Sequence, residues 1–390
     1  MAGWLAGGSG AKGEASLADS DLAPVPSSYN DRALKKDLVQ LVPTLPPAVS
    51  GVGDYATLLA RELLAYHRVG TRFVVGDPGW RPGADADAPF PAAAVPARSA
   101  RALLGALGGP GTVLLHYVSY GYAPRGCPFW LVDALERWRR AGPGRRLVVI
   151  FHEVYASGPP WGSAFWTSPF QRRLAARLAR LADARRITTT ISLHELRGTL
   201  RRAEKSRLPT AVAPVFSNLG EPAHLSPPAA RERQVVVFGS PLWREAAYTG
   251  GGAAALGAFC ARHGIGRVVD VGTPLAGGAP RLAGVEVEAA GVLPAPAAGA
   301  LFARSLAGYF HYPAPHLGKS GIFAAYCAHG LVPVTYAANR AAADGLRAGL
   351  HYLAGDADDQ PPLDAVAAAA AAWYGEHRLE VHARDVAALV

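Results

Sequence analysis

Short runs rich in valine, isoleucine and leucine alternate along the chain with longer stretches of helical spacing that are rich in alanine, leucine and arginine. This alternation is typical of βα units on a largely parallel sheet. The sequence contains no repeat of solenoid period and no heptads, which argues against stacked repeats and coiled coils. The chain is therefore predicted to be an α/β protein.

Two domains are expected, because 390 residues allow two cores of about 150 to 200 residues each. A polar, proline-rich segment at residues 218–228 separates two βα series and is the predicted linker. The predicted domains are residues 36–217 and 218–375, followed by a C-terminal helix at residues 376–390 that returns toward the first domain. Residues 1–35, whose start is rich in glycine, alanine and serine, are predicted to be a mobile leader.

Each series supplies its own set of predicted strands. Those of the first series lie at residues 38–42, 73–75, 112–117, 147–151, 187–192 and 211–214. Those of the second series lie at residues 234–238, 268–271, 285–287, 308–310 and 331–334. Two parallel-sheet domains in succession place their ligand between the carboxyl ends of both sheets. The expected fold is therefore two Rossmann-like domains facing across a cleft, with the site residues in the loops after strands.

Bulk properties exclude several classes of protein. No stretch approaches the roughly 20 apolar residues of a spanning helix, and the N-terminus lacks the pattern of a secretory signal, so we expect a cytoplasmic protein. The three cysteines are far apart, without CxxC spacing, so neither a disulfide framework nor a bound metal is expected. The net charge of +9 favours a polyanionic ligand such as a phosphate.

Gly51 and Gly53 lie between the first predicted strand and its helix. Backbone without side chains lets a ligand approach the positive helix N-terminus at such a position. The same glycines can serve only a tight turn, and Ala56 stands where the dinucleotide fingerprint has its third glycine. Asp54 is expected to complement the helix dipole.

The segment after the strand at residues 147–151 carries two titratable residues and then a stiff, aromatic-rich loop. His152 is a candidate hydrogen-bond donor to a ligand hydroxyl, and Glu153 is a candidate general base if its surroundings raise its pKa toward neutrality. Both can also be ordinary polar residues at a strand end. Further ring-bearing side chains near strand ends are candidates for stacking on a ligand or for simple packing: His116, Tyr155 and Trp161.

In the second series, a buried strand is followed by Gly239, Ser240 and then Arg244. An arginine beyond such a turn can clamp phosphate oxygens with two hydrogen bonds. Arginine is so common in this chain that a chance placement explains Arg244 equally well.

A glycine-flanked loop at residues 318–321 precedes another predicted helix. The Lys319 ammonium, the Ser320 hydroxyl and backbone NH groups near Gly321 can together hold a diphosphate. The loop is not a Walker A motif, because the required upstream glycine spacing is absent.

These residues resemble the GT-B glycosyltransferases, in particular the large retaining family of bacterial polysaccharide and glycolipid assembly, over most of the chain after Leu38. The resemblance implies that the loop at residues 43–53 lines the donor site and that His152 touches the transferred sugar. It also implies that Gly239 and Arg244 lie near the diphosphate. His116, Tyr155 and Trp161 are then expected on the acceptor side.

The resemblance extends to the end of the second series. The turn containing Gly291 and Leu293 matches the place where backbone groups meet the nucleotide base, and residues 328–334 resemble the family's helix-to-strand signature. The family's paired glutamates would fall near Leu317 and Ala325, and neither position is acidic. The usual carboxylate contact to the donor is therefore missing from the sequence.

The implied function is transfer of a sugar from a UDP- or GDP-linked donor to a saccharide or lipid-linked acceptor, in polysaccharide or glycoconjugate assembly. Neither a cofactor nor a nucleic-acid partner is expected. Two alternatives stay open: a non-catalytic GT-B-like binding subunit, favoured by the missing glutamates, and a sugar-nucleotide epimerase. An arginine-rich helix face could hold the protein to the inner face of a membrane, or it is a solvated surface: Arg172, Arg173, Arg177 and Arg180.

Overall fold

Two parallel sheets, each covered by helices, divide the chain into two α/β units. The computed structural model describes Leu34 and residues 36–83, 90–336 and 343–390. Apart from Leu34, the predicted leader lies outside these residues. Within the described chain, residues 34–213 and Leu379–Val390 make up unit 1, and Pro214–Arg378 make up unit 2. The prediction of two parallel-sheet units is confirmed.

Unit 1 is built on a seven-stranded sheet in the order β3-β2-β1-β4-β5-β6-β7, in which all pairings are parallel. The strands are β1 (Lys36–Val42), β2 (Val69–Val75), β3 (Ala92–Ala94), β4 (Gly111–Tyr117), β5 (Arg145–Phe151), β6 (Ala184–Ile187) and β7 (Ala211–Val212). The first six follow the order of the doubly wound Rossmann fold.

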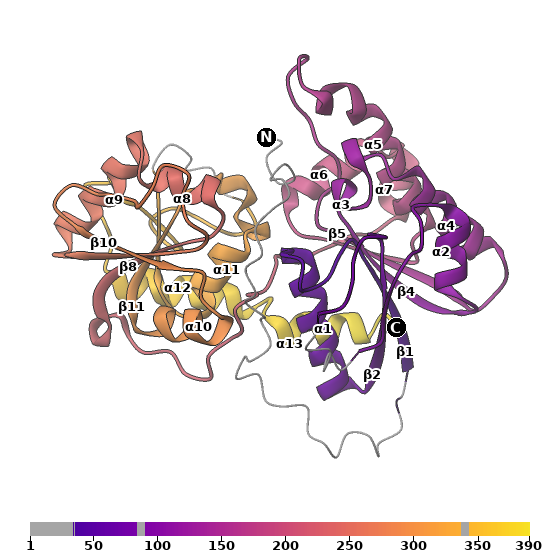
Figure 1. Cartoon of the computed structure of the whole chain (residues 1–390), viewed down its shortest axis with the longest axis horizontal. Coiled ribbons are helices and arrows are strands. Elements are labelled where there is room, and N and C mark those ends of the chain that lie inside the picture. The colour runs from indigo at the N-terminus through magenta and orange to yellow at the C-terminus, as the bar shows by residue number, and fades with distance from the viewer. Residues whose placement is uncertain (1–33, 35, 84–89, 337–342) are drawn as a thin grey trace. The chain divides into compact units, whose positions relative to one another are not determined.

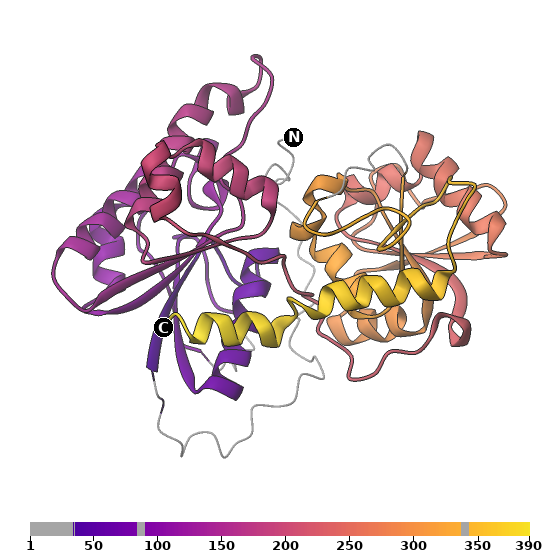
Figure 2. The ribbon, with the colours of Figure 1, turned by 180° about the vertical axis from the view of Figure 1, so that it is seen from behind.

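Helices cover both faces of this sheet (Figures 1 and 2). They are α1 (Gly51–His67), α2 (Ala100–Leu107), α3 (Ser119–Tyr122), α4 (Phe129–Arg140), α5 (Ser163–Leu181), α6 (Thr190–Gly198), α7 (Arg202–Arg207) and α13 (Leu379–Ala387). The odd-numbered residues of β4 and β5 pack into one core with α2, α4 and α5. Since successive strand residues point to opposite faces, the even-numbered residues, including His116, face away from that core. Helix α13 packs against α1.

Unit 2 repeats the same strand order in a six-stranded parallel sheet, β10-β9-β8-β11-β12-β13. Its strands are β8 (Glu232–Phe238), β9 (Arg267–Val271), β10 (Glu286–Gly291), β11 (Ser305–Phe310), β12 (Val332–Thr335) and β13 (Leu353–Ala354). Its main helices are α8 (Pro241–Ala247), α9 (Gly250–Arg262), α10 (Ala295–Arg304), α11 (Gly321–Ala328) and α12 (Leu363–Gly375), with a 3-10 helix η4 (Ala314–Lys319) before α11.

One predicted strand is wrong over most of its length. The strand expected at residues 187–192 is β6, which ends at Ile187, and α6 follows from Thr190. The cause is a helix cap: Thr189 Oγ1 accepts a hydrogen bond from the backbone NH of Ser192 at 3.0 Å. In the described part of the chain, no helix is long and apolar enough to cross a membrane.

Candidate functional site

The strand order reverses between β1 and β4 in unit 1 and between β8 and β11 in unit 2. Ligands of doubly wound sheets bind beyond the carboxyl ends of the strands at this point. The last residues of the strands, the loops after them and the helix starts at these ends contain predicted site residues of each unit. In unit 1 they are Gly51, Gly53, His116, His152 and Glu153; in unit 2 they are Gly239, Ser240, Lys319, Ser320 and Gly321.

The start of α1 lies tightly against the loop that follows β1. Ser50 caps the helix, and its Oγ accepts a hydrogen bond from the NH of Gly53 at 3.2 Å. A Cβ at Gly53 would lie 2.8 Å from the carbonyl oxygen of Thr44, so only glycine fits there. The structure thus assigns Gly53 a packing role. Gly51 is the first residue of the helix, where backbone NH groups point out of the helix end.

A chain of buried polar side chains runs behind the carboxyl ends of β1, β4 and β5. Gln40 Nε2 donates to Thr71 Oγ1 at 3.3 Å, and Gln40 Oε1 lies 2.8 Å from His116 Nε2. His116 Nδ1 in turn lies 3.2 Å from His152 Nε2. The rings of His116 and His152 are stacked, with centroids 5.4 Å apart. His116 is completely buried and His152 is 8% exposed.

The hydrogen bonds fix the tautomers of both histidines. With the Gln40 amide donating to Thr71, His116 Nε2 must carry the proton that Gln40 accepts. His116 Nδ1 is then an acceptor, so His152 donates from Nε2 and keeps its lone pair on Nδ1. Burial lowers the pKa of His152 to about 4, and burial together with His152 lowers the pKa of His116. The expectation that His152 donates to a ligand is corrected: its available nitrogen, Nδ1, accepts.

Tyr55, in the first turns of α1, packs against the row of buried polar side chains that contains His116 and His152. Its ring meets the His152 ring edge to face at a centroid distance of 5.0 Å. Its hydroxyl lies 2.7 Å from Nδ1 of His382 in α13. The C-terminal helix therefore contributes a side chain to the packing behind the histidines. The sequence does not reveal this pair, because 327 residues separate its members.

Asp54 is a titratable group that sequence analysis treated only as a dipole partner. It lies half-buried in the first turn of α1, and desolvation raises its pKa to about 7. A carboxyl group with a pKa near neutrality can exchange protons in catalysis. Nothing in the sequence distinguishes it from an ordinary acidic residue at a helix start. Glu153 follows His152, and its backbone NH donates to the Tyr117 carbonyl at 3.4 Å; its role as a base stays a prediction.

We expect Asp54→Asn to stabilise the protein at neutral and alkaline pH. The pKa is raised in the folded state, so the carboxylate destabilises the fold increasingly as the pH rises from about 4 to about 7. The shift sets an upper bound of about 4 kcal/mol, and we expect about 1 to 2 kcal/mol because Asp54 is only half-buried. Urea denaturation at about pH 8 should show this gain, and at about pH 4 it should vanish. Asp37→Asn, at an exposed carboxylate of β1, is the control. An equal gain in the free energy of unfolding at both pH values would contradict the raised pKa of Asp54.

The two predicted aromatic contacts of the loop after His152 differ in their surroundings. Tyr155 is half-buried beneath the Arg172 guanidinium, whose carbon lies 4.4 Å from the ring centroid. Trp161 is 89% exposed, and within the described residues it has no ring partner. Gln171 of α5 fixes the position of the loop after His152. Its buried Oε1 accepts a hydrogen bond from the backbone NH of Ala156 at 2.7 Å.

In unit 2, the loop after β8 lies close to the start of α11. Gly239 has a positive φ of 129°, and a Cβ there would lie 2.4 Å from Ile322 Cδ1. Ser240 is exposed and precedes α8. The positive φ favours glycine at this position, and the close approach brings the predicted residues of both loops together.

The start of α11 presents unpaired backbone donors beside a lysine. Ser320 caps the helix by accepting from the NH of Phe323 at 3.2 Å. The NH groups of Gly321 and Ile322 make no hydrogen bond to any other described residue. Lys319 lies half-buried directly before the cap, and burial together with the Lys319 charge lowers the pKa of His316. Such a helix start attracts anions.

Arg244 has a different role from the expected phosphate clamp. Its guanidinium is 2% exposed and forms a two-point ion pair with the buried Asp270. A third nitrogen donates to the Thr273 carbonyl at 2.6 Å, and Tyr248 donates to the same carboxylate at 2.9 Å. Because all three nitrogens have protein partners, we assign Arg244 to support of the loops after β8 and β9.

An aromatic cluster at the carboxyl edge of this sheet escaped sequence analysis. Trp243 packs on Tyr312 at a centroid distance of 5.1 Å and lies 6.2 Å from His311. His311 also stacks with Tyr336 at 6.0 Å. Burial lowers the pKa of His311, and its Nδ1 is buried with no partner in the described structure. The sequence signal was present, since both His311 and Tyr312 follow a predicted strand directly.

The remaining predicted positions of unit 2 lie at or just beyond the end of β10, in η4 and in α11. Gly291 ends β10 with a positive φ of 71°, and its carbonyl accepts from the NH of Gly272 at 2.8 Å. Leu293 is half-buried just beyond it. Leu317 and Ala325, where the family's glutamates would fall, are both 1% exposed. Apolar packing therefore fills the places of the missing carboxylates.

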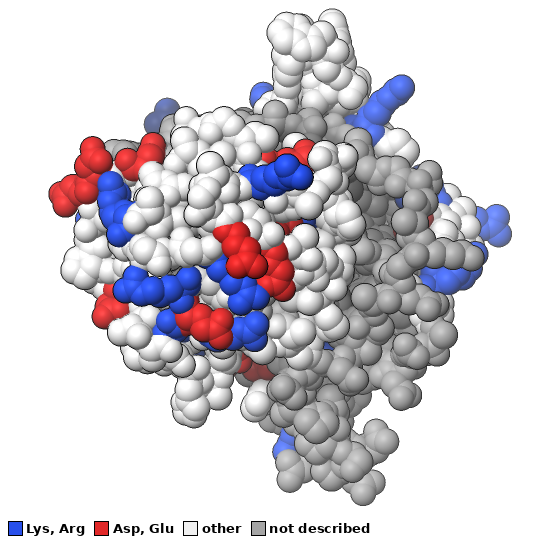
Figure 3. Space-filling model, turned by 60° about the vertical axis from the view of Figure 1, so that its left-hand side comes forward, with Lys and Arg blue, Asp and Glu red and all other residues white. Residues whose placement is uncertain are grey.

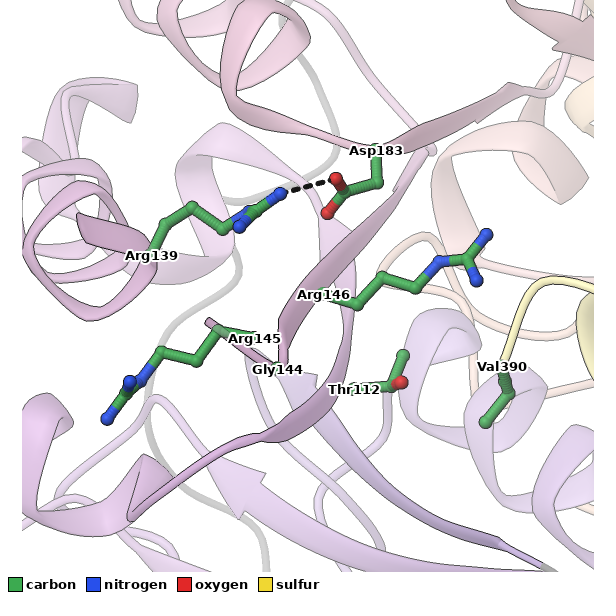
Figure 4. A pocket seen from close by; sticks show the side chains of 7 residues that line it. All are labelled: Thr112, Arg139, Gly144, Arg145, Arg146, Asp183 and Val390. Carbon is green, nitrogen blue, oxygen red and sulfur yellow. Dashed lines mark hydrogen bonds and ion pairs between the residues drawn. The ribbon is translucent and has the colours of Figure 1, made fainter. Parts of the chain in front are cut away.

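A cavity of about 530 Å³ in unit 1 lies away from these residues, at the amino ends of the strands (Figure 4). Its lining residues are Thr112, Arg139, Gly144, Arg145, Arg146, Asp183 and Val390. Arg139 is paired with Asp183 at 2.6 Å, and the side chains of Arg145 and Arg146 point in different directions. It contains no predicted site residue. Among the described residues, no group of three or more His, Cys, Asp or Glu side chains could hold a metal ion.

No protein-family model and no curated protein sequence matches the chain. Solved structures match in fold. An alpha-glucosyltransferase in complex with UDP has 10% identity and a TM-score of 0.56, over 90% of this chain and 100% of the other. An alpha,alpha-trehalose-phosphate synthase (UDP-forming) from Burkholderia xenovorans, in complex with glucose-6-phosphate, has 12% identity and a TM-score of 0.51, over 90% and 98%.

A third structure is of an alpha-glucosyltransferase in complex with UDP and a 13-mer DNA containing an HMU base. It has 9% identity and a TM-score of 0.55, over 90% of this chain and 99% of the other. At such low identity these likenesses establish the fold. The chain has the two parallel-sheet units of the GT-B fold, as the sequence resemblance predicted.

Proposed function

We propose that the chain is a nucleotide-sugar glycosyltransferase, which moves a sugar from a UDP- or GDP-linked donor to a saccharide or lipid-linked acceptor. The observation that carries the proposal is the likeness of fold, over 90% of the chain, to an alpha-glucosyltransferase in complex with UDP. The trehalose-phosphate synthase is likewise UDP-forming by its description. UDP is therefore the first nucleotide to test. We assign the reaction to polysaccharide or glycoconjugate assembly in the cytoplasm.

Unit 2 supplies the donor-binding groups in this proposal. The NH groups of Gly321 and Ile322 and the ammonium of Lys319 hold the diphosphate, which gains charge as it leaves. Gly239 and Ser240 lie beside the proposed diphosphate position. The turn at Gly291 and Leu293 contacts the nucleotide base. No metal is needed in this scheme, because cationic and NH groups face the leaving diphosphate.

Unit 1 supplies the groups that meet the transferred sugar. His152 accepts a hydrogen bond from a sugar hydroxyl at Nδ1, because its Nε2 is committed to His116. Asp54 and Glu153 are the candidate carboxyl groups for proton exchange with the acceptor hydroxyl. Asp54→Asn and Glu153→Gln, compared by turnover, should show which of them does so.

Two measurements test the proposed function. Calorimetry with UDP, GDP and uridine measures donor binding, and release of UDP from UDP-glucose in the presence and absence of glucose-6-phosphate measures turnover. Binding of a nucleotide diphosphate with sugar transfer supports the proposal. Binding without turnover on any acceptor would favour the non-catalytic subunit, and interconversion of the sugar on the nucleotide would favour an epimerase. No binding of any nucleotide would reject all three.

A further inference from the structure

Most exposed aromatic side chains of the described residues lie in α5, in the loop before it and at the start of α4. Eleven large apolar residues are exposed in the described structure, and every exposed phenylalanine and tryptophan among them belongs to one group of five. We name this group the aromatic surface: Phe129, Trp161, Phe165, Trp166 and Phe170. Single exposed apolar residues are normal on soluble proteins, whereas a contiguous group marks an interaction site.

Four of the five residues of the aromatic surface lie in a segment that projects from unit 1, and the fifth, Phe129, lies in α4. The loop after β5 and the first half of α5 extend beyond the rest of the unit (Figure 1). Trp166 Nε1 donates to the Pro160 carbonyl at 2.9 Å, which links the helix to the loop. Phe170 meets Phe129 of α4 edge to face at 6.3 Å. The projection is therefore fixed by contacts, with its aromatic side chains turned outward.

Charge distinguishes this segment from the rest of the surface. No aspartate or glutamate occurs at residues 154–182. Exposed arginines flank the aromatic rings: Arg125, Arg172 and Arg173. None of these three has a carboxylate partner among the described residues. At 3.6 residues per turn, Trp166, Phe170 and Arg173 share one face of α5.

On other parts of the described surface, acidic side chains lie next to the basic ones. The face shown in Figure 3 carries acidic and basic side chains next to one another, and unit 2 has surface ion pairs such as Arg267–Glu288 and Arg304–Glu232. On α5 itself, Arg177 pairs with Asp133 and Glu136, and Arg180 pairs with Glu204. The four-arginine face expected from the sequence is thus half neutralised. The remaining positive charge lies toward the aromatic end.

We propose that the aromatic surface docks the protein on a membrane whose surface carries anionic lipid. Tryptophan and phenylalanine partition into the boundary between headgroups and acyl chains, and unpaired arginines are attracted to anionic headgroups. The loop from His152 leads to Trp161 in nine residues. Docking therefore brings the sugar-binding edge of unit 1 to the membrane, where a lipid-linked acceptor lies. That last step rests on the proposed function; the docking does not.

Vesicle sedimentation tests the docking. We expect the full chain to bind vesicles of equal parts phosphatidylcholine and phosphatidylglycerol, and to bind phosphatidylcholine alone about tenfold more weakly. The double variants Trp166→Ser/Phe170→Ser and Arg172→Gln/Arg173→Gln should each lose about tenfold in affinity for the mixed vesicles. The controls are Tyr66→Ser and Arg101→Gln, at exposed positions of α1 and α2, and both should bind as the parent does.

Absence of binding, or binding that both double variants retain, would overturn the proposal. Two other ligands of the aromatic surface, a second copy of the chain and a soluble saccharide, can be recognised by measurements without lipid. Self-association in sedimentation velocity that the aromatic variant abolishes would indicate a second copy of the chain, and loss of soluble saccharide binding in that variant would indicate a stacking platform. Calorimetry with UDP separates the two proposals: failure of vesicle binding with UDP binding intact rejects only the docking, and the converse rejects only the proposed function.

Discussion

Replacing His152 with alanine should lower turnover by about 100-fold, because loss of a group that positions the transferred sugar misplaces the reacting atoms, and a displacement of about 1 Å costs about that much. The affinity for UDP should change by less than about twofold. His152 belongs to unit 1, and the proposed diphosphate contacts belong to unit 2. Steady-state kinetics with UDP-glucose, beside calorimetry with UDP, measures both quantities.

The pH dependence adds a second readout for the same residue. His152 accepts a hydrogen bond only when Nδ1 is unprotonated. Since burial lowers its pKa to about 4, its contribution should be constant at neutral pH and lost as the pH falls through about 4. His194→Ala, at an exposed histidine of α6, is the matched control and should leave turnover unchanged. Intact turnover in His152→Ala with a collapse of UDP affinity would refute the assignment.

The fold was predictable because its signal is local. Most strands of the two sheets read as short apolar runs, and alternation with helices predicts parallel pairing. The strands β3 and β13, of three and two residues, are too short to give this signal and were not predicted. The failure at residues 187–192 also comes from this local signal. The sequence from Ile187 to Ser192 is β-branched and polar, so it reads as a strand, and only the cap formed by Thr189 shows where the helix begins.

The site was predictable only in part, because its geometry depends on contacts between distant segments. Position at or just after a strand end was enough to select His116 and His152, and position before a predicted helix was enough to select Lys319. It could not reveal that His116 fixes the tautomer of His152, which turns an expected donor into an acceptor. Nor could it distinguish Arg244 from the many other arginines, since its partner Asp270 is on another strand.

The second large effect is expected at Lys319, where substitution by alanine should weaken UDP binding by about 10- to 100-fold. A hydrogen bond to a charged group contributes about 1.5 to 3 kcal/mol, which corresponds to this range. Lys319 directly precedes the capped start of α11, where the NH groups of Gly321 and Ile322 have no hydrogen-bond partner among the residues that the structure describes. A compact ammonium beside these groups stabilises the oxygens of a diphosphate.

The loss should be specific for the phosphates. Uridine, which lacks them, should bind Lys319→Ala and the parent protein equally well, and Lys319→Arg should recover part of the UDP affinity because it keeps the charge but changes its shape. Lys205→Ala, at an exposed lysine of α7, controls for the loss of one positive charge from the whole protein. Calorimetry with UDP and uridine on all four proteins decides the matter. Equal losses for both ligands, or none for either, would remove Lys319 from the donor site, because a point charge at the helix start can distinguish the two ligands only through the phosphates it touches.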